Sequence, residues 1–313
     1  MVLAGADVGG TNVVVGLVGD DHQVLARAKR DTPRSVDELV DQVAAMVGDL
    51  PERPDALGIG IPGIIHEGRV VQAPNLAGWD RTTDVAATLG ERLGVPVTLV
   101  NDAQCGLVGE WVAGAGQGAR FLFGVWLGTG VGAGLVLDGR PYDGAGGGSG
   151  EFGHVVVRPD GARCGCGRRG CVEAYAGRRM MTESVRALAA AGRRTRLFEI
   201  QEAKGKAQAT SGVWAAAVAE GDPVVAEVLA EAVAALGVGV ANVWNLLDLE
   251  RVVIGGGMAG KLGPYLAEAI TEAARPHAVR AIAADQVVAG VLGDDAGVVG
   301  AAEAARHPGR LPA

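Results

Sequence analysis

The chain has 313 residues, of which 49% are hydrophobic and 20% charged, so it can fill two hydrophobic cores and is neither disordered nor fibrous. Its formal net charge of −8 provides no broad positive field for a polyanion, which disfavours nucleic acid as a partner and favours small molecules. The first residues, MVLAGADVGG, lack a basic segment, and Asp7 interrupts the apolar run. We therefore expect no signal peptide and a cytoplasmic protein.

The first part of the chain alternates strand-like and helical segments. Four short apolar runs predict β-strands: LAGADV, NVVVGLV, QVLARAKR and ALGIGI. A helix is expected between the last two, over residues 35–48. The first three strands have connections too short for helical crossovers, so we expect a mixed sheet in an α/β domain. A further apolar run, VTLV, predicts a strand that leads into a helix over residues 103–112.

Residues 121–139 repeat the pattern of residues 2–18, namely an apolar strand, a Gly/Thr turn and a second apolar strand. This internal echo predicts two related domains with a boundary near the GAGQG segment. We expect a small N-terminal α/β domain over residues 1–117, joined by a C-terminal helix over residues 297–313. The larger α/β domain, with a zinc-binding loop, is expected over residues 118–296.

The larger domain is predicted to be mostly helical over residues 171–247, with a polar surface loop or short helix at residues 201–212. The apolar stretch over residues 232–247 contains two asparagines and is shorter than the ~20 residues that span a bilayer. We expect a buried core helix there and no membrane association, with Gly237 and Gly239 permitting close packing. The remaining runs predict, in order, a strand (RVVIGGG), a helix after residue 259, a strand (QVVAG) and a final helix from residue 296.

Two glycine-rich turns, each between two predicted strands, are candidate phosphate-binding loops. The first contains Asp7, Gly9, Gly10, Thr11 and Asn12, and the second contains Gly128, Thr129 and Gly130. Glycine permits close backbone approach, so amide N–H groups and Thr hydroxyls can surround phosphate oxygens, while Asp7 can hold a hydrated magnesium ion. For the first turn, a hairpin without a ligand is an equal alternative. In the second, the alternating glycines would weaken a strand pair unless a ligand approaches closely.

A third glycine-rich segment, GGGMAG at residues 255–260, follows a predicted strand and opens a helix whose N-terminus can receive a phosphate or nucleotide. It matches G-x-G-x-x-G, but so does GIGIPG at residues 58–63. A dinucleotide site would also need an acidic residue about 20 positions later, at the end of the next strand, where Arg275 and Arg280 precede Asp285. The Rossmann interpretation is therefore poor. No G-x-x-x-x-G-K-[ST] motif occurs, so a nucleotide would be bound without a Walker lysine.

The sequence EFGH, followed by CGCGRRGCVE, is the strongest pattern in the chain. It supplies four candidate metal ligands: His154, Cys164, Cys166 and Cys171. Three thiolates and one imidazole make a closed tetrahedral zinc site, and clustered cysteines in a reducing compartment favour metal over disulfides. Because His154 has two ring nitrogens, one can bind zinc while the other faces a ligand. Glu151 and Glu173 flank the cluster and can accept hydrogen bonds from sugar hydroxyls.

Asn101 and Asp102 lie between a predicted strand and a predicted helix. Taken alone, an aspartate at a helix start is most often a cap, so these residues by themselves favour capping of the helix by Asp102. Cys105, in the same helix, is expected to be an inert packed thiol.

Together these motifs resemble the ROK family of bacterial repressors and sugar kinases, and most closely its glucokinase-like members. The resemblance covers nearly the whole chain and rests above all on the E-x-G-H and C-x-C-G-x-x-G-C-x-E signature. It implies two ribonuclease H-like domains of the actin and hexokinase type, with an active site in the cleft between them. It also suggests a homodimer or homotetramer.

The resemblance implies a role for each motif. Asp7, Gly10 and Thr11 would handle the phosphates and Mg²⁺, and Gly128, Thr129 and Gly130 would cradle the transferring end of ATP. Gly256 and Gly257 would lie along the nucleotide. The implied sugar-binding residues are Gly63, Asn75, Asn101, Asp102, Glu151, His154 and Glu173. Asp102 would be the general base, and a structural Zn²⁺ would be held by His154 and the three cysteines.

Two departures from the family pattern touch helices beside the implied sugar pocket. Relatives usually have N-D-A-N after the strand, whereas this chain has Gln104 in the fourth position, followed by Cys105 and Gly106. The serine common after E-x-x-A is Gly177 here. Neither departure removes a catalytic group, but both bear on the choice of sugar.

These observations predict an ATP-dependent hexose kinase of carbohydrate metabolism and glycolysis, with the 6-hydroxyl of glucose as the favoured acceptor. Alternatives within the class are N-acetylmannosamine, N-acetylglucosamine, fructose or allose as acceptor and polyphosphate as donor. A sugar-sensing repressor is disfavoured, because such relatives carry an N-terminal helix-turn-helix domain and the phosphate hairpin here begins at Val2. A sugar-binding protein without catalysis is disfavoured because Asp102 and both phosphate loops are present.

Overall fold

The computed structural model describes residues 1–72 and 84–306, which form two compact units. Unit 1 consists of residues 1–124, 134–150 and those from 291 onward, and unit 2 consists of residues 125–133 and 151–290. The domain limits expected at residues 117/118 and 296/297 stay a prediction.

Unit 1 is built on a mixed five-stranded sheet in the order β3-β2-β1-β4-β7. Its strands are β1 (Leu3–Val8), β2 (Asn12–Val18), β3 (Val24–Asp31), β4 (Ala56–Ile61) and β7 (Val97–Asn101). β1, β2 and β3 are antiparallel neighbours, whereas β1, β4 and β7 run parallel. The predicted mixed sheet is therefore confirmed, and the parallel strands bring Asp7 and Asn101 to their carboxyl ends.

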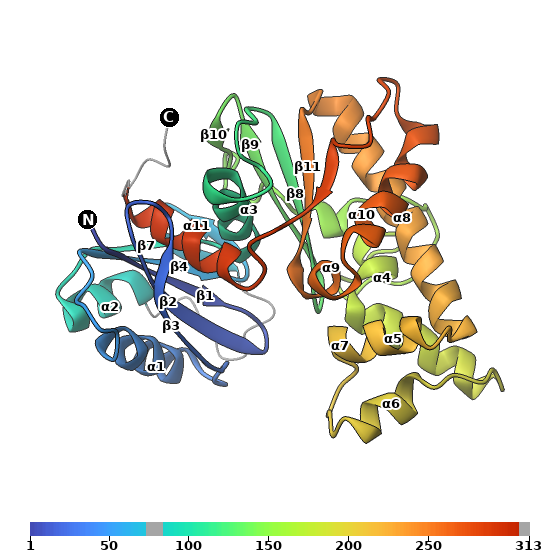
Figure 1. The fold of residues 1–313 in the computed structure, drawn as a ribbon, viewed down its shortest axis with the longest axis horizontal. Coiled ribbons are helices and arrows are strands. Elements are labelled where there is room, and N and C mark those ends of the chain that lie inside the picture. The colour runs from blue at the N-terminus through green and yellow to red at the C-terminus, as the bar shows by residue number, and fades with distance from the viewer. Residues whose placement is uncertain (73–83, 307–313) are drawn as a thin grey trace. The chain divides into compact units, whose positions relative to one another are not determined.

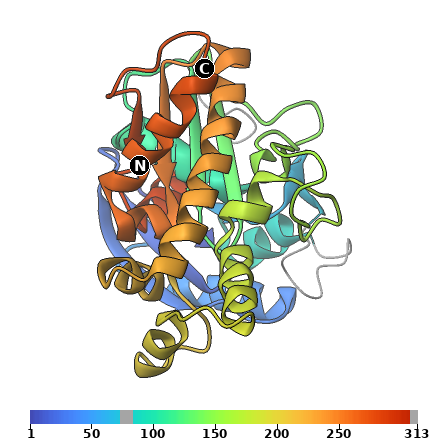
Figure 2. The same cartoon turned by 90° about the vertical axis from the view of Figure 1, so that its right-hand side faces the viewer.

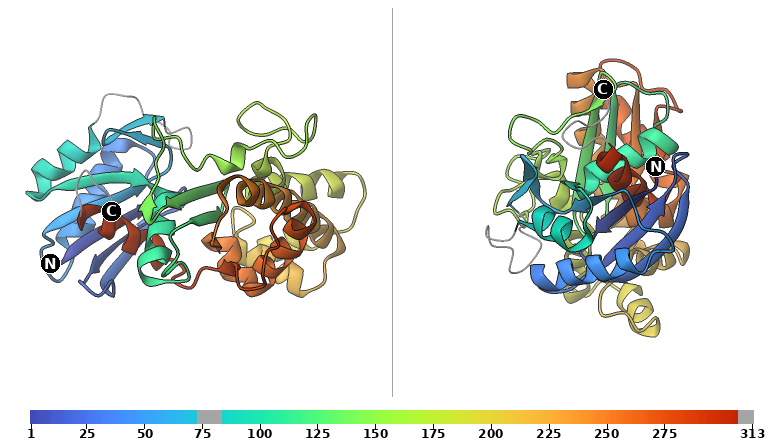
Figure 3. Two further views of the ribbon diagram at one scale, coloured as in Figure 1. Left: turned by 90° about the horizontal axis from the view of Figure 1, so that it is seen from above. Right: turned by 90° about the vertical axis from the view of Figure 1, so that its left-hand side faces the viewer.

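Helices cover both faces of this sheet (Figure 1). α1 (Val36–Gly48) and α2 (Val85–Leu93) share one core with the side chains of Ala4, Ala6 and Val8, which alternate along β1. On the other face, α11 (Asp295–Arg306) packs against β1 and α3 (Asp102–Ala113), and Figure 3 shows the red α11 against the blue strands. Gly58 permits this packing, because a Cβ there would overlap the carbonyl of Ala301.

The second sheet has the order β10-β9-β8-β11-β12. Its strands are β8 (Leu122–Leu127), β9 (Val131–Leu137), β10 (Arg140–Pro141), β11 (Arg251–Gly255) and β12 (Val287–Ala289). β8 and β9 enclose the second glycine-rich turn, as β1 and β2 enclose the first. The strand, turn and strand repeat expected from the sequence is confirmed.

Unit 2 is largely helical beside its part of this sheet. In chain order its helices are η1 (Phe152–His154), α4 (Val172–Ala176), α5 (Arg178–Ala190), α6 (Leu197–Ala203), α7 (Ser211–Ala219), α8 (Pro223–Leu247), α9 (Gly256–Leu262), α10 (Pro264–Ala274) and η2 (Arg275–His277). The long α8, orange in Figure 2, contacts α4, α5 and α10. The expected helical stretch and its polar interruption are thus present.

α8 is the one helix among the described residues whose length and composition would allow a membrane span, and 61% of its most apolar window is buried. Its glycines explain the burial. A Cβ on Gly237 would lie 2.6 Å from the backbone carbon of Ala273, and one on Gly239 would lie 2.7 Å from the ring of Phe152. The prediction of a buried helix that uses both glycines for close packing is confirmed.

Three features differ from the expected elements. A short hairpin of β5 (Ile64–His66) and β6 (Arg69–Gln72), and the helix α2, were not expected. The expected strand RVVIGGG ends at Gly255, because Gly256 takes a positive φ of 84° and opens α9. The third glycine-rich segment is therefore a strand-to-helix turn.

Candidate functional site

The first glycine-rich turn joins the ends of β1 and β2. The Gly9 N–H donates to the Asn12 carbonyl at 2.9 Å, and the Thr32 hydroxyl donates to the Gly9 carbonyl at 2.6 Å. Gly10 and Thr11 are exposed at the tip, and a Cβ on Gly10 would meet no atom within 4 Å. The turn is therefore held at its base and open at its tip, as a loop that receives a ligand must be.

Asp7 lies on the face of β1 that meets α11, where its carboxylate packs against Gly297. The pKa of Asp7 is raised to about 7, first by burial and then by the neighbouring carboxylates of Asp102 and Asp294, while Lys29 opposes the rise. Asp294 itself pairs with Lys29 at 3.0 Å, so Asp102 is the main acidic neighbour of Asp7. This environment fits the magnesium-handling role implied for Asp7.

The strand β7 ends at Asn101, which caps α3. Its Oδ1 accepts a hydrogen bond from the Gln104 N–H at 3.0 Å, and its Nδ2 donates to the Gly63 carbonyl at 2.9 Å. Asp102 is the first residue of the helix, and its Oδ1 accepts from the Ala103 N–H at 2.9 Å. The expectation that Asp102 is the cap is wrong, because Asn101 fills that role and leaves Asp102 at a position where the helix dipole favours a carboxylate.

Gln104, the first departure from the family pattern, has a structural explanation. Its buried side chain bonds the backbone of Leu135 twice, with Nε2 donating to the carbonyl and Oε1 accepting from the N–H, each at 2.9 Å. Gln104 therefore fastens α3 to β9 within unit 1. Next to it, burial and then the charge of Asp7 raise the pKa of the Cys105 thiol well above its usual range. Cys105 is buried, in agreement with the expected inert thiol.

The second glycine-rich turn, residues 128–130, is supported by the helices that follow the cysteine cluster. The first two backbone N–H groups of α5, those of Arg178 and Arg179, donate to the carbonyls of Gly128 and Thr129 at 3.2 and 3.1 Å. The Arg178 guanidinium also donates to the Thr129 hydroxyl at 3.0 Å. Sequence reasoning missed Arg178, and the only available signal was the arginine pair that follows Gly177.

Glu173 lies against the same turn. Its Oε2 accepts from the Val131 N–H at 3.0 Å and occupies the space where a Cβ on Gly130 would be. A Cβ on Gly177 would lie 3.0 Å from the Glu173 Cγ. The second departure from the family pattern therefore leaves room for this position of the Glu173 side chain.

The third glycine-rich segment backs onto β8. A Cβ on Gly256 would lie 2.7 Å from the backbone of Leu127, and one on Gly257 would lie 3.1 Å from the Ser211 hydroxyl oxygen. Gly256 is thus close to the residue that precedes the second turn. The second and third glycine-rich segments of unit 2 are therefore neighbours at this point.

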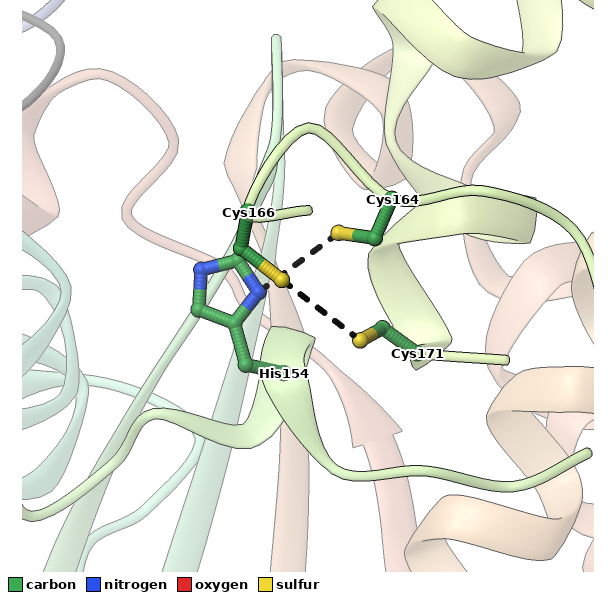
Figure 4. Close-up of side chains that lie close together, drawn as sticks. All are labelled: His154, Cys164, Cys166 and Cys171. Carbon is green, nitrogen blue, oxygen red and sulfur yellow. Dashed lines mark hydrogen bonds between the residues drawn. The ribbon is translucent and has the colours of Figure 1, made fainter. Parts of the chain in front are cut away.

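His154, Cys164, Cys166 and Cys171 come together, and Figure 4 shows their side chains pointing toward one another. Their nearest ligand atoms all lie within 4.8 Å of one another. His154 Nδ1 is 3.7 Å from Cys164 Sγ, and the Sγ atoms of Cys166 and Cys171 are 3.8 Å apart. The predicted four residues therefore form one cluster that can hold a metal ion.

The environment of the thiols differs within the cluster. Burial raises the pKa of Cys164 to about 12. At Cys166, burial is outweighed by hydrogen bonds from the Arg168 backbone and side chain and from Cys164 and Cys171, which together lower the pKa to about 6. Cys166 is thus the thiol most ready to bind a metal as a thiolate.

His154 faces two ways. While Nδ1 points into the cluster, Nε2 lies 3.9 Å from the Glu151 Oε2. The 3₁₀ helix η1 fixes this arrangement, with the His154 N–H donating to the Glu151 carbonyl at 3.0 Å. The two-sided role expected for His154 is therefore geometrically possible.

The implied sugar-binding residues fall in both units. Gly63, Asn101 and Asp102 belong to unit 1, and Glu151, His154 and Glu173 belong to unit 2. Asn75 lies outside the described residues. Within unit 1, Asn101 holds Gly63 directly.

The paired strand–turn–strand sheets and their helices define a protein with the two-domain α/β fold of actin and hexokinase. The ROK family model matches residues 3–307, and the chain belongs to the ROK family. It is 32% identical to a glucokinase of Streptomyces coelicolor over 97% of both chains. It is 33% identical to an N-acetylmannosamine kinase of Citrobacter koseri, over 95% of this chain and 96% of that one.

Superposition on a solved structure of a ROK family member supports the same assignment. The ROK glucokinase from Streptomyces griseus, in complex with glucose and AMPPNP, superposes with a TM-score of 0.86 at 32% identity. The match covers 98% of this chain and 99% of that one. The family predicted from the motifs is confirmed.

Proposed function

We propose that the protein is an ATP-dependent glucokinase that transfers the γ-phosphoryl group of ATP to the 6-hydroxyl of glucose. The observation that carries the proposal is the start of α3, where Asn101 caps the helix and Asp102 is its first residue, at the end where the helix dipole favours a carboxylate. The glucokinases among its relatives, and the complex of one of them with glucose and an ATP analogue, support the choice of substrates.

The donor would bind at the glycine-rich turns. In this proposal Asp7, Gly9, Gly10, Thr11 and Asn12 handle the phosphates together with Mg²⁺. Gly128, Thr129 and Gly130 cradle the transferring end of ATP, and Gly256 and Gly257 lie along the nucleotide. Backbone amides in open glycine turns are suited to this task, because their N–H groups can approach phosphate oxygens. Magnesium, when bound, would neutralise charge on the phosphates.

The acceptor would be held by Asn101, Asp102, Glu151, His154 and Glu173, together with Gly63 and Asn75. The Asp102 carboxylate would take the proton of the 6-hydroxyl. The sugar oxygen would then bond to the γ-phosphorus, while the bond from the γ-phosphorus to the β,γ-bridging oxygen breaks and ADP leaves. The products are glucose 6-phosphate and ADP. General-base help of this kind contributes about 10²–10⁴ in rate.

The four-residue cluster suits a structural Zn²⁺. A Zn–S distance of about 2.3 Å gives a tetrahedral S···S edge of about 3.8 Å, and with a Zn–N distance of about 2.0–2.1 Å the N···S edge is about 3.5 Å. The separations of 3.8 Å between Cys166 and Cys171 and of 3.7 Å between His154 and Cys164 match these edges. With four protein ligands the site is closed, so we assign zinc the role of orienting His154 toward the sugar.

An ADP-release assay across glucose, N-acetylmannosamine, N-acetylglucosamine, fructose and allose tests the proposal, with polyphosphate as an alternative donor. We expect glucose with ATP to give the highest kcat/KM. A higher value with another sugar would change the substrate, and a faster reaction with polyphosphate would change the donor. Glucose binding without turnover of any sugar would instead identify a sugar sensor.

The remaining expectations accompany this proposal. We propose a cytoplasmic homodimer or homotetramer at the entry of glucose into glycolysis. Nucleic acid and membranes are not proposed as partners. The functional domains are proposed to be residues 1–117 with 297–313, and residues 118–296.

A further inference from the structure

Arg178 is fastened to the second glycine-rich turn at two points. Its backbone N–H donates to the Gly128 carbonyl at 3.2 Å, and its Nη2 donates to the Thr129 hydroxyl oxygen at 3.0 Å. The side chain is half-buried. The guanidinium therefore has a defined position beside the turn.

The charge of Arg178 lacks a counterion in the part of the chain that the structure describes. No carboxylate oxygen of a described residue lies within 4.0 Å of its guanidinium, whereas Arg158 pairs with Glu231 and Arg193 pairs with Glu227. The nearby Glu173 directs Oε2 to the Val131 N–H. Burial lowers the pKa of Arg178, but a guanidinium stays protonated in proteins.

The position of Arg178 within its helix is a second unfavourable feature of this charge. Arg178 is the first residue of α5, a helix of 13 residues, and the N-terminus of a helix disfavours a cation. A half-buried cation without a counterion at a helix N-terminus breaks a local rule of stability. Such exceptions are expected at functional sites, where a ligand supplies the missing interaction.

We propose that Arg178 binds the phosphate chain of the donor, at its transferring end. The inference rests on the proposed function, because that function places the transferring phosphate at Thr129. The hydroxyl oxygen of Thr129 accepts from Arg178, so its proton is available for a phosphate oxygen. The other guanidinium N–H groups can donate to the same phosphate, as arginine does in bidentate phosphate contacts.

In the reaction Arg178 would neither gain nor lose a proton. The bond from the γ-phosphorus to the β,γ-bridging oxygen breaks, the bond to the sugar oxygen forms, and the sugar proton goes to Asp102. Arg178 would offset the negative charge on the phosphate oxygens throughout. A fixed arginine in this role acts only through charge and hydrogen bonds.

Arg178→Gln tests the proposal, with Arg179→Gln as the matched control. Arg179 is the next residue of α5, and its exposed side chain pairs with Glu183 at 3.7 Å. Its backbone bond to Thr129 survives a side-chain change. Titration calorimetry should show that Arg178→Gln binds ATP and inorganic tripolyphosphate roughly 10- to 150-fold more weakly, as expected for the loss of a charged hydrogen bond. Adenosine binding should be unchanged, and Arg179→Gln should bind all three ligands like the original protein.

A charge role and a purely structural role are separated by chemical rescue. We expect Arg178→Ala to regain part of its tripolyphosphate affinity when millimolar guanidinium is added, while the control is unaffected. Equal phosphate affinity of the Arg178→Gln and Arg179→Gln variants would overturn the inference, and so would a loss in Arg178→Gln that extends equally to adenosine. Absence of sugar phosphorylation by the original protein would refute the proposed function alone, because the tripolyphosphate titration needs no sugar.

Discussion

Removing the charge of Asp7 should stabilise the fold while abolishing the proposed phosphoryl transfer. The pKa of Asp7 is raised from 3.8 to about 7 by burial first and then by Asp102 and Asp294. Between these two values the folded chain binds the proton more tightly than the unfolded chain, so folding loses stability as pH rises. At about 1.4 kcal/mol for each pH unit, the ionised carboxylate costs up to about 4 kcal/mol above pH 7.

Asp7→Asn keeps the shape of the side chain and cannot ionise. Urea unfolding without nucleotide or magnesium should show a gain of up to about 4 kcal/mol at pH 8, shrinking as pH falls and nearly absent at about pH 3. Asp21→Asn, at an exposed position of the same unit, should change stability by less than about 0.5 kcal/mol at every pH. A gain at Asp7 that is the same at pH 5 and pH 8 would refute the electrostatic reasoning.

Three further predictions concern the cluster, the sugar and the core. Cys166→Ser should lose bound zinc and sugar affinity together, whereas Cys105→Ala should retain one zinc per chain by elemental analysis. Glu173→Gln should keep the bond to Val131 and raise the KM for glucose roughly 10-fold or more with little change for ATP; an equal rise for both substrates would assign Glu173 to the phosphate turn alone. Gln104→Ala should lower the free energy of unfolding by roughly 2–4 kcal/mol, because two backbone groups of Leu135 lose their partner; a loss below about 0.5 kcal/mol would contradict this.

The sheets were predictable because their strands have long apolar runs with clear ends. LAGADV and ALGIGI coincide with β1 and β4, and both glycine-rich turns lie where the sequence places them. The Cys₃His cluster was also predictable, because its ligands are close in sequence and chemically specific. Local signals of this kind need no knowledge of tertiary contacts.

The missed features depend on contacts that sequence patterns do not contain. Asn101 and Asp102 are equally good caps, so only the structure identifies Asn101 as the cap. The partner of Gln104 lies 31 residues away on β9, and the contact between Arg178 and Thr129 spans 49 residues. The hairpin of β5 and β6 was missed because its strands are short and largely exposed.

The central claim is that Asp102 is the base of a glucose kinase. The most direct measurement is the formation of glucose 6-phosphate from glucose and ATP, followed by ³¹P NMR, for the original protein and for Asp102→Asn. Because Asn101 caps α3, the variant should stay folded, keep the zinc proposed for the four-residue cluster and bind both substrates. Its kcat should fall by at least roughly 10². Near-normal turnover by Asp102→Asn, or no glucose 6-phosphate from the original protein, would contradict the claim.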